Sequence, residues 1–192
     1  MQEALTYDDV LLLPQYSDIR SRSEVDISTD LGRGLELTLP IISSPMDTIS
    51  EDLMAGAMSN AGGCSIIHRY NTIGHQAELV GHARANGADN IGFAVGITGD
   101  FLERTEKCIE AGGKFVCVDV AHGHHIMMRE VLASIRREFG QDLHIMAGNV
   151  ATLDGINHLA DWGADSVRCN IGGGSICSTR VQTGHGIPGL QT

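Results

Sequence analysis

The feature that most constrains the fold of this chain is a recurrence of short apolar runs, one about every 22 to 28 residues. The six runs are Leu39–Ser43, Cys64–Ile67, Asn90–Val95, Lys114–Val118, Leu143–Ala147 and Asp165–Cys169. Most of them are nearly continuous rather than alternating, which is typical of strands buried on both faces of a parallel sheet. The sequence therefore predicts six parallel strands.

Helical patterns separate these runs. Glu51–Ala61, Met127–Phe139 and the segment after Thr152 each place apolar residues along one stripe of a helix. We expect Ser50 and Thr152 to cap the first and the last of these helices through their side-chain oxygens. Strand, loop and helix in regular alternation predict repeated βα units.

Glycine is unusually frequent, with 24 among 192 residues against an average of about 7 %. The segments 86–89, 111–114 and 162–165 each place a glycine directly after a predicted helix. We expect these glycines to form left-handed caps that lead into the next strand. The run Gly172-Gly173-Gly174 is different, because it leaves main-chain groups uncovered for a phosphate or a cation.

Two architectures fit repeated βα units. A doubly wound open sheet is complete with five or six strands, whereas a (β/α)8 barrel needs eight strands and typically about 250 residues. Counting alone gives six units and favours the open sheet.

Charge and cysteine content exclude several classes of protein. The formal net charge is −11, and without basic runs we expect no nucleic-acid binding, although a single nucleotide remains compatible. We expect no membrane span, because no apolar run approaches 18 residues, and the N-terminus shows no secretory signal. Five cysteines without CxxC spacing predict neither a disulfide framework nor a zinc site, which favours the cytoplasm.

In either architecture ligands bind at the carboxyl ends of the strands. Polar residues follow all six predicted strands. Asp119 ends an apolar strand, where its carboxylate could accept hydrogen bonds from ribose hydroxyls; the alternative is a cap for the next helix. His122, His124 and His125 suggest a metal, but no nearby Cys or Glu completes a ligand set, and we favour no metal there.

The segment after the sixth strand, Asn170–Arg180, is the richest in chemistry, and we call it the cysteine loop. Cys177 lies just beyond the three glycines, where its thiolate could attack an electrophilic carbon. The alternative for this residue alone is a packed thiol.

Four motifs occur in register along the chain: Leu5–Pro14, Ser44–Thr48, Ala147–Thr152 and Gly172–Arg180. Together they resemble the IMP dehydrogenase/GMP reductase family. The resemblance covers essentially the whole chain and implies a (β/α)8 barrel, in place of the open sheet favoured by counting. Residues 1–38 would form an N-terminal extension, and residues 39–192 the βα units one to six of an incomplete barrel.

The resemblance also implies roles for individual residues. Cys177 matches the nucleophile that forms a covalent adduct at C2 of a purine nucleotide monophosphate, and Thr179 matches a proton-relay threonine. The residues implied to contact the substrate are Ser44, Met46, Asn149, Arg168 and the phosphate contact Ser175, and those implied to contact NAD or NADP are His68, Asp119 and Asn170. Main-chain oxygens of Gly172, Gly174 and Cys177 match a monovalent-cation site, which would take K⁺.

Two reactions are compatible with this resemblance. IMP dehydrogenases convert IMP, NAD⁺ and water to XMP, and GMP reductases convert GMP and NADPH to IMP and ammonia. The segments Ser43–Asp47 and Thr179–Val181 favour a dehydrogenase, which we expect, whereas residues 21–26 and the absence of an inserted domain after the second strand favour a reductase. The chain departs from the family at Asn170, where Gly is usual, and at Gly173, where Pro is frequent; the Asn170 side chain could crowd the nicotinamide.

The family barrel continues with two further βα units, more phosphate-binding loops and a mobile flap. We therefore expect either a fragment or one half of a split enzyme that needs a complementing C-terminal chain, or else a non-catalytic remnant that still binds a nucleotide. Family members form homotetramers, which an incomplete barrel need not do.

Overall fold

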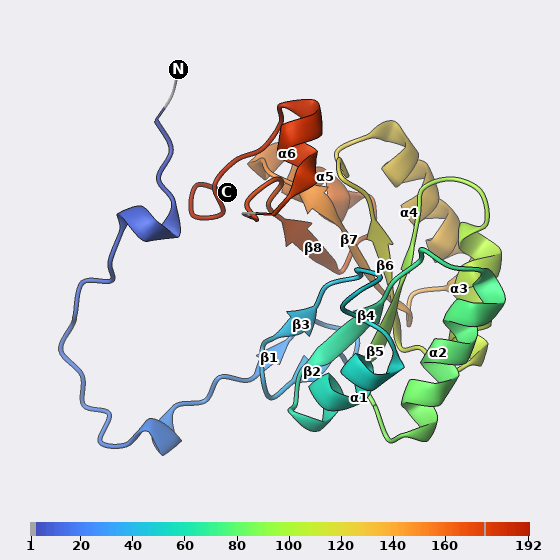
Figure 1. Ribbon diagram of the computed structural model, residues 1–192, viewed down its shortest axis with the longest axis horizontal. Coiled ribbons are helices and arrows are strands. Elements are labelled where there is room, and N and C mark those ends of the chain that lie inside the picture. The colour runs from blue at the N-terminus through green and yellow to red at the C-terminus, as the bar shows by residue number, and fades with distance from the viewer. Residues whose placement is uncertain (1–2, 175) are drawn as a thin grey trace.

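The computed structural model describes residues 3–174 and 176–192. Its centre is a six-stranded parallel sheet in the order β3-β4-β5-β6-β7-β8 (Figure 1). The strands are β3 (Ile42–Ser43), β4 (Cys64–Ile67), β5 (Ile91–Val95), β6 (Phe115–Asp119), β7 (His144–Val150) and β8 (Ser166–Cys169). All six strands predicted from the apolar runs are confirmed.

Helices connect these strands and cover one face of the sheet (Figure 1). They are α1 (Asp52–Asn60), α2 (Ile73–Ala85), α3 (Phe101–Glu110), α4 (Ile126–Phe139), α5 (Leu153–Asp161) and the short α6 (Ser178–Thr183). In the part of the chain that the structure describes, none of them has the length and hydrophobicity that a membrane crossing requires.

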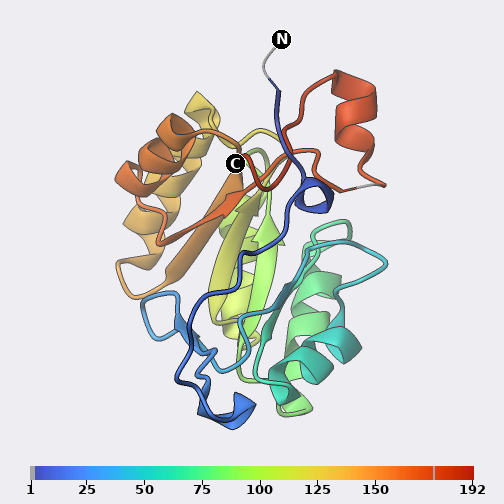
Figure 2. The same cartoon turned by 90° about the vertical axis from the view of Figure 1, so that its left-hand side faces the viewer.

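The order of the strands decides between the two architectures. A doubly wound sheet reverses its strand order at one point, whereas here every strand pairs with its neighbour in sequence. Helices then fall on one face only, and the sheet curls around its other face as an incomplete barrel (Figure 2). The open sheet suggested by counting is wrong, because the strand order is that of a barrel. Counting failed because six strands can be either a complete open sheet or part of a barrel.

Two cores lie on the two faces of this curled sheet. The outer core packs Phe93, Val116 and Ile145 against the helices. The inner core contains Ile66, Phe115, Cys117 and Met146. Alternation along each strand therefore sends every second side chain into the barrel interior, even though the sequence of the strand is apolar throughout.

The ends of the helices follow the predicted glycine chemistry. Gly87, Gly112 and Gly163 have φ of +86°, +104° and +107°, which confirms the predicted glycine stops. Thr152 caps α5, since its Oγ1 accepts a hydrogen bond from Gly155 N–H at 3.1 Å. The predicted cap at Ser50 is wrong, because Glu51 occupies the cap position of α1.

Ser50 instead joins the loop after β3 to the sheet. Its side chain is buried, and its hydroxyl donates to Ser43 Oγ at 2.9 Å, with the Ser44 carbonyl as a second close partner. Because the Ser50 hydroxyl is bound to Ser43 and Ser44, it is not available to the main-chain N–H groups at the start of α1, and the predicted cap does not form.

The N-terminal residues form two different parts. The antiparallel strands β1 (Thr29–Asp30) and β2 (Glu36–Leu37) close the amino end of the barrel interior, and Leu35 and Leu37 are buried in the inner core. Residues 3–28 leave the body and carry only the 3₁₀ helices η1 (Tyr7–Asp9) and η2 (Arg22–Glu24) (Figure 1).

Candidate active site

Three neighbouring strands place Asp119, Gly148 and Arg168 in one row at the carboxyl end of the sheet. Asp119 of β6 pairs with Gly148 of β7, and Gly148 pairs with Arg168 of β8. The Arg168 guanidinium reaches across Gly148 and donates to the Asp119 carboxylate. A Cβ at position 148 would lie 2.6 Å from Arg168 Cβ, so the ion pair depends on a glycine between its partners.

Both charges of this pair are largely shielded from water, with about one fifth of each side chain exposed. Burial disfavours the charged guanidinium, but the neighbouring Cys117 and Asp119 outweigh it and hold the pKa of Arg168 above its ordinary value. One oxygen of the Asp119 side chain is therefore already engaged by Arg168. The alternative role of Asp119 as a helix cap is wrong, because His125 caps α4, its Nδ1 accepting from Met127 N–H at 3.2 Å.

Asn149 ties three of the strand-end loops together. Its side-chain Nδ2 donates to the Asn170 carbonyl at 3.2 Å. Its main-chain carbonyl accepts from Gly123 N–H at 2.7 Å, and Asn170 N–H donates to the Val150 carbonyl at 2.8 Å. The loops after β6, β7 and β8 thus hold one another in place around the Asp119–Arg168 pair.

Asn170 and Gly173, the two residues that depart from the pattern of the resembled family, lie side by side in the structure. Asn170 has φ of +101°, a conformation that glycine adopts freely and asparagine tolerates better than most other residues. Its side-chain amide lies where a Cβ at Gly173 would be, 2.3 Å from Nδ2, and it also approaches Gly189. A proline at position 173 would therefore collide with Asn170, whereas glycine accommodates it.

The cysteine loop places Cys177 at the start of α6. The Cys177 N–H donates to the Gly174 carbonyl at 3.1 Å, which closes the turn that contains the glycine run. The Thr179 hydroxyl and main-chain N–H beside the sulfur lower the pKa of the Cys177 thiol, and the main-chain N–H and the positive charge of Arg180 add less. Ser175, the predicted phosphate contact, lies outside the described residues.

The other four cysteines have the opposite character. Burial raises the pKa of Cys64, Cys108 and Cys117 to about 12, and partial burial of its sulfur raises that of Cys169. Because the thiolate is the reactive form of cysteine, Cys177 is the one of the five thiols whose surroundings favour that form.

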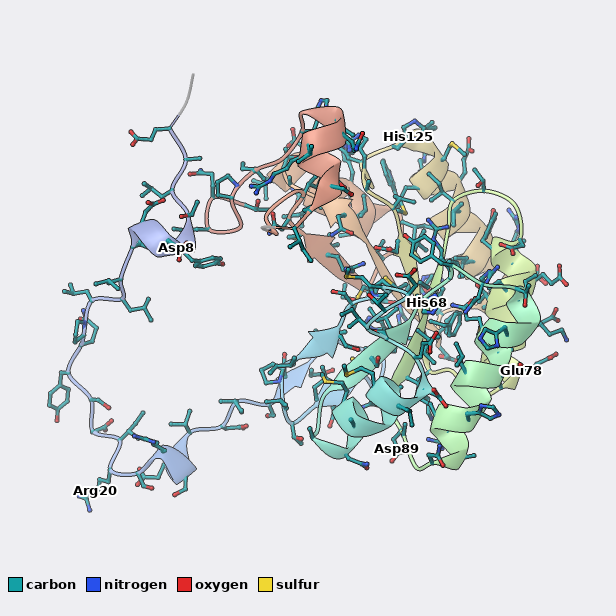
Figure 3. The ribbon with its side chains drawn as sticks, in the orientation of Figure 1. Asp8, Arg20, His68, Glu78, Asp89 and His125 are labelled. Carbon is teal, nitrogen blue, oxygen red and sulfur yellow. The ribbon has the colours of Figure 1, made fainter. Side chains whose placement is uncertain are left out.

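His68 is buried in the second strand-end loop and has a defined tautomer. Its Nδ1 accepts from Tyr70 N–H at 3.2 Å, so its Nε2 carries the proton that faces the Glu51 carboxylate at 3.1 Å. Figure 3 shows His68 within the body of the protein, far from the N-terminal residues Asp8 and Arg20. The ring is thus fixed by its own loop and by the N-terminus of α1.

Two features of this rim escaped the sequence reasoning. Arg69 extends from the loop after β4 until its Nη2 lies 3.4 Å from the Asp119 carbonyl, and its buried Nε has no hydrogen-bond partner among the described residues. Gly148 is the second, because its role follows from the strand register. The sequence did offer a signal for Gly148: this glycine follows an apolar run, and the runs before and after it end near the oppositely charged Asp119 and Arg168.

The predicted site residues Ser44, Arg168 and Thr179 line two different cavities. Ser44 and Arg168 line a cavity of about 190 Å³ that faces the barrel interior. Thr179 lines a larger cleft of about 680 Å³, together with His122, His124 and Thr152 from neighbouring loops. Met46, with 44 % of its surface exposed, lines neither of these two cavities, although its N–H donates to the Ser44 carbonyl at 2.8 Å.

The histidines of the fourth strand-end loop have three different surroundings. His122 lines the larger cleft, His125 caps α4, and His124 Nε2 lies 2.8 Å from His158 Nδ1 of α5. Within residues 3–174 and 176–192, no three His, Cys, Asp or Glu side chains converge as metal ligands do.

An incomplete parallel βα barrel whose polar and charged side chains gather at the carboxyl ends of its strands has the arrangement of a barrel enzyme. Comparison with known families gives the particular class. Residues 4–192 match the model of the IMP dehydrogenase / GMP reductase domain. The chain belongs to this family.

Curated relatives of both kinds are similar to the chain over nearly its whole length. It is 30 % identical to the inosine-5'-monophosphate dehydrogenase of Nitrosopumilus maritimus, covering 98 % of the chain and 65 % of the relative. The corresponding enzyme of Cryptosporidium parvum is 31 % identical, covering 97 % and 56 %. The GMP reductase of Vibrio atlanticus is 34 % identical, covering 97 % and 55 %. The chain thus spans between half and two thirds of the length of these relatives.

Proposed function

We propose that the chain carries the nucleophilic half of a purine-nucleotide oxidoreductase, in which Cys177 forms a covalent adduct at C2 of a purine nucleotide monophosphate. The observation that carries this proposal is the position of Cys177, which begins α6 and closes the glycine turn after β8 through its N–H to the Gly174 carbonyl. The pKa, lowered at Cys177 and raised at the other four thiols, supports it. The Thr179 hydroxyl lies beside the Cys177 sulfur and lowers its pKa. We propose that the same hydroxyl relays a proton during the reaction.

The substrate-binding residues are proposed from the family resemblance and from their positions. Arg168 and Ser44 face the same cavity, and Asn149 is held beside them by its bond to Asn170. Ser175 is the proposed phosphate contact, and Met46, which has 44 % of its surface exposed, is proposed to line the nucleotide site.

The polar rim also fits a nicotinamide cofactor. Asn170 Oδ1 and Arg69 Nε are buried without hydrogen-bond partners among the described residues, and such groups are costly to leave unpaired. We propose that Asp119, Asn170 and His68 hold the cofactor, which accepts or donates a hydride when bound. The main-chain oxygens of Gly172, Gly174 and Cys177 are the proposed K⁺ ligands; of these, the Gly174 oxygen already accepts the Cys177 N–H.

In the dehydrogenase reaction, which we favour, the thiolate adds to C2 of IMP, the C2 hydrogen leaves as hydride, and water then releases XMP and the free thiol. The segments Ser43–Asp47 and Thr179–Val181 support this direction. The reductase reaction is the second candidate, in which the thiolate adds to C2 of GMP and the protonated C2 amino group leaves as ammonia. A hydride from NADPH would then add to C2, and the thiolate would leave to release IMP. One observation favours it: the alignment with the Vibrio atlanticus GMP reductase runs over 193 positions and needs almost no insertion, whereas that with the Nitrosopumilus maritimus dehydrogenase runs over 312.

Absorbance of the reduced nicotinamide distinguishes the two candidates. The dehydrogenase assignment predicts an increase with IMP and NAD⁺, and the reductase assignment a decrease with GMP and NADPH. Cys177→Ala abolishes either signal, and Cys169→Ala, a matched change of a thiol with a raised pKa, leaves it unchanged. A signal that survives Cys177→Ala contradicts the proposal.

Because the chain spans 55–65 % of these relatives, we propose that turnover requires the remaining βα units of the barrel, which a complementing polypeptide can supply in an assay, and that the complete barrel assembles as a cytoplasmic homotetramer. Turnover that appears only after such a polypeptide is added supports this assembly. Turnover by the chain alone contradicts it.

A further inference from the structure

Two histidines from different elements meet on the helical side of the incomplete barrel. His124 lies in the loop between β6 and α4, and His158 lies on α5. Their side chains face each other, with His124 Nε2 2.8 Å from His158 Nδ1. Figure 2 shows α4 and α5 side by side, so that the loop entering α4 comes close to α5. The sequence favoured no metal at the loop histidines because no further ligand follows nearby; the structure brings one from 34 positions away.

Both imidazole rings are held in place by their surroundings. Trp162 packs against the outer core, and the His158 ring stacks on its indole with a centroid separation of 5.5 Å and an interplanar angle of 26°. The loop is tied down directly before His124, since Gly123 N–H donates to the Asn149 carbonyl at 2.7 Å. Rings held in this way lose little further freedom when they bind a ligand.

The separation of the two nitrogens fits a metal ion. Two imidazole nitrogens bound to one metal at about 2.0–2.1 Å are about 2.8–3.0 Å apart at an angle of about 90°, and about 3.3–3.4 Å apart at the tetrahedral angle. The observed 2.8 Å between His124 Nε2 and His158 Nδ1 corresponds to the right angle, which Cu²⁺ and Ni²⁺ prefer. The metal takes the place of the proton that joins the two nitrogens, and this proton moves to the far nitrogen of its ring, because a neutral imidazole keeps one N–H.

We propose that His124 and His158 form a binding site for one divalent transition-metal ion with right-angled coordination, of the class of Ni²⁺ and Cu²⁺. The two imidazoles supply two adjacent ligands, and water fills the remaining positions, because the described residues bring no third His, Cys, Asp or Glu to the pair. The formal net charge of −11 attracts cations to the molecule. His124 also lines the larger cleft, so the ion is held at the edge of that cleft. The proposal is independent of Cys177 and of the reaction proposed above.

Titration of the chain, freed of any histidine tag, with NiCl₂ tests the proposal. Trp162 is the only tryptophan of the chain and stacks on His158, so a paramagnetic ion bound there quenches its fluorescence. We expect one strong site per chain by calorimetry, with the same midpoint as the quenching. His124→Phe and His158→Phe each keep an aromatic ring but remove a ligand nitrogen. Each weakens the site by at least about 10–100-fold, the loss that follows when even a residue supporting a metal ligand is removed.

The matched control is His82→Phe on α2, which replaces another histidine whose side chain is 68 % exposed and leaves both affinity and quenching unchanged. Cys177→Ala also binds Ni²⁺ as the unmodified chain does, which shows that the reactive thiol is not the site. Zn²⁺, which prefers tetrahedral ligands, binds more weakly than Ni²⁺. Absence of a one-to-one site, an affinity that His124→Phe or His158→Phe leaves unchanged, an equal loss in His82→Phe or Cys177→Ala, or tighter binding of Zn²⁺ than of Ni²⁺ would overturn the inference.

Discussion

Replacement of Gly148 by alanine is the sharpest perturbation of the strand-end row. A methyl group there would lie 2.6 Å from Arg168 Cβ and 2.8 Å from the Arg168 carbonyl oxygen, whereas ordinary contacts begin near 3.4 Å. Most of this clash is with the backbone of β8, which cannot rotate away. The strand must therefore move by close to an ångström, and the Arg168 side chain moves with it, away from Asp119.

The expected cost has two parts. Overpacking in a closely packed interior costs about 1–3 kcal/mol. Breaking a fully buried ion pair costs about 3–5 kcal/mol, of which we count only a fraction, because each partner keeps about one fifth of its side chain exposed to water. Together these give a loss of about 2–4 kcal/mol in the free energy of unfolding, or a fall of about 4–16 °C in the melting temperature of a chain of this size.

Urea unfolding followed by circular dichroism measures this loss. The matched control is Gly81→Ala in the middle of α2, where a Cβ would meet nothing within 4 Å. Alanine is better than glycine in a helix by about 0.5–1 kcal/mol, so the control stabilises the protein. A Gly148→Ala variant as stable as the unmodified chain would refute the proposed role of this glycine.

Three further predictions follow from individual groups. Burial opposes ionisation of Asp165, but hydrogen bonds from Ile145 N–H and two arginines lower its pKa below the usual value of 3.8. The ionised Asp165 therefore stabilises the fold fully above about pH 4, and this stabilisation is lost as the pH falls through the lower folded-state pKa. Urea midpoints measured from pH 6 to pH 2 fall more steeply for the unmodified chain than for Asp165→Asn. Gly173→Ala forces the Asn170 amide to rotate away and destabilises the protein by about 1 kcal/mol, at the low end of overpacking costs. Adding Asn170→Gly recovers most of the loss; equal losses with and without that second change would contradict the coupling. Thr179→Val raises the pKa of Cys177 and slows its alkylation by iodoacetamide near neutral pH, measured by peptide mass spectrometry, whereas an unchanged rate would show that the hydroxyl does not stabilise the thiolate.

Much of the fold follows from local pattern in the sequence. Six apolar runs predicted six strands, because a strand buried on both faces must be apolar at nearly every position. Gly87, Gly112 and Gly163 predicted the ends of three helices, because the position after a helix often requires a positive φ. The choice between an open sheet and a barrel did not follow from the strand count, since strand order is a property of long-range pairing.

The residues of the candidate site were proposed from the sequence, but their contacts could not be. Asp119, Arg168 and Cys177 were each identified from the sequence, yet the ion pair across Gly148 depends on the register of three strands. Ser50 was assigned to a helix cap because its partners in the loop after β3 are not visible in local sequence. For the same reason the position of the Asn170 amide against Gly173 could not be foreseen.

Covalent labelling tests the central claim most directly. A purine riboside monophosphate with chlorine at C2 offers the proposed carbon with a leaving group, so that attack by the thiolate forms a thioether and releases chloride. Peptide mass spectrometry of the chain, with and without the complementing polypeptide, should find the label on Cys177, with Cys169 unlabelled and with protection by IMP or GMP. Labelling that is spread over the exposed cysteines, or that neither nucleotide prevents, would contradict the assignment of Cys177 as the nucleophile of a purine-nucleotide site.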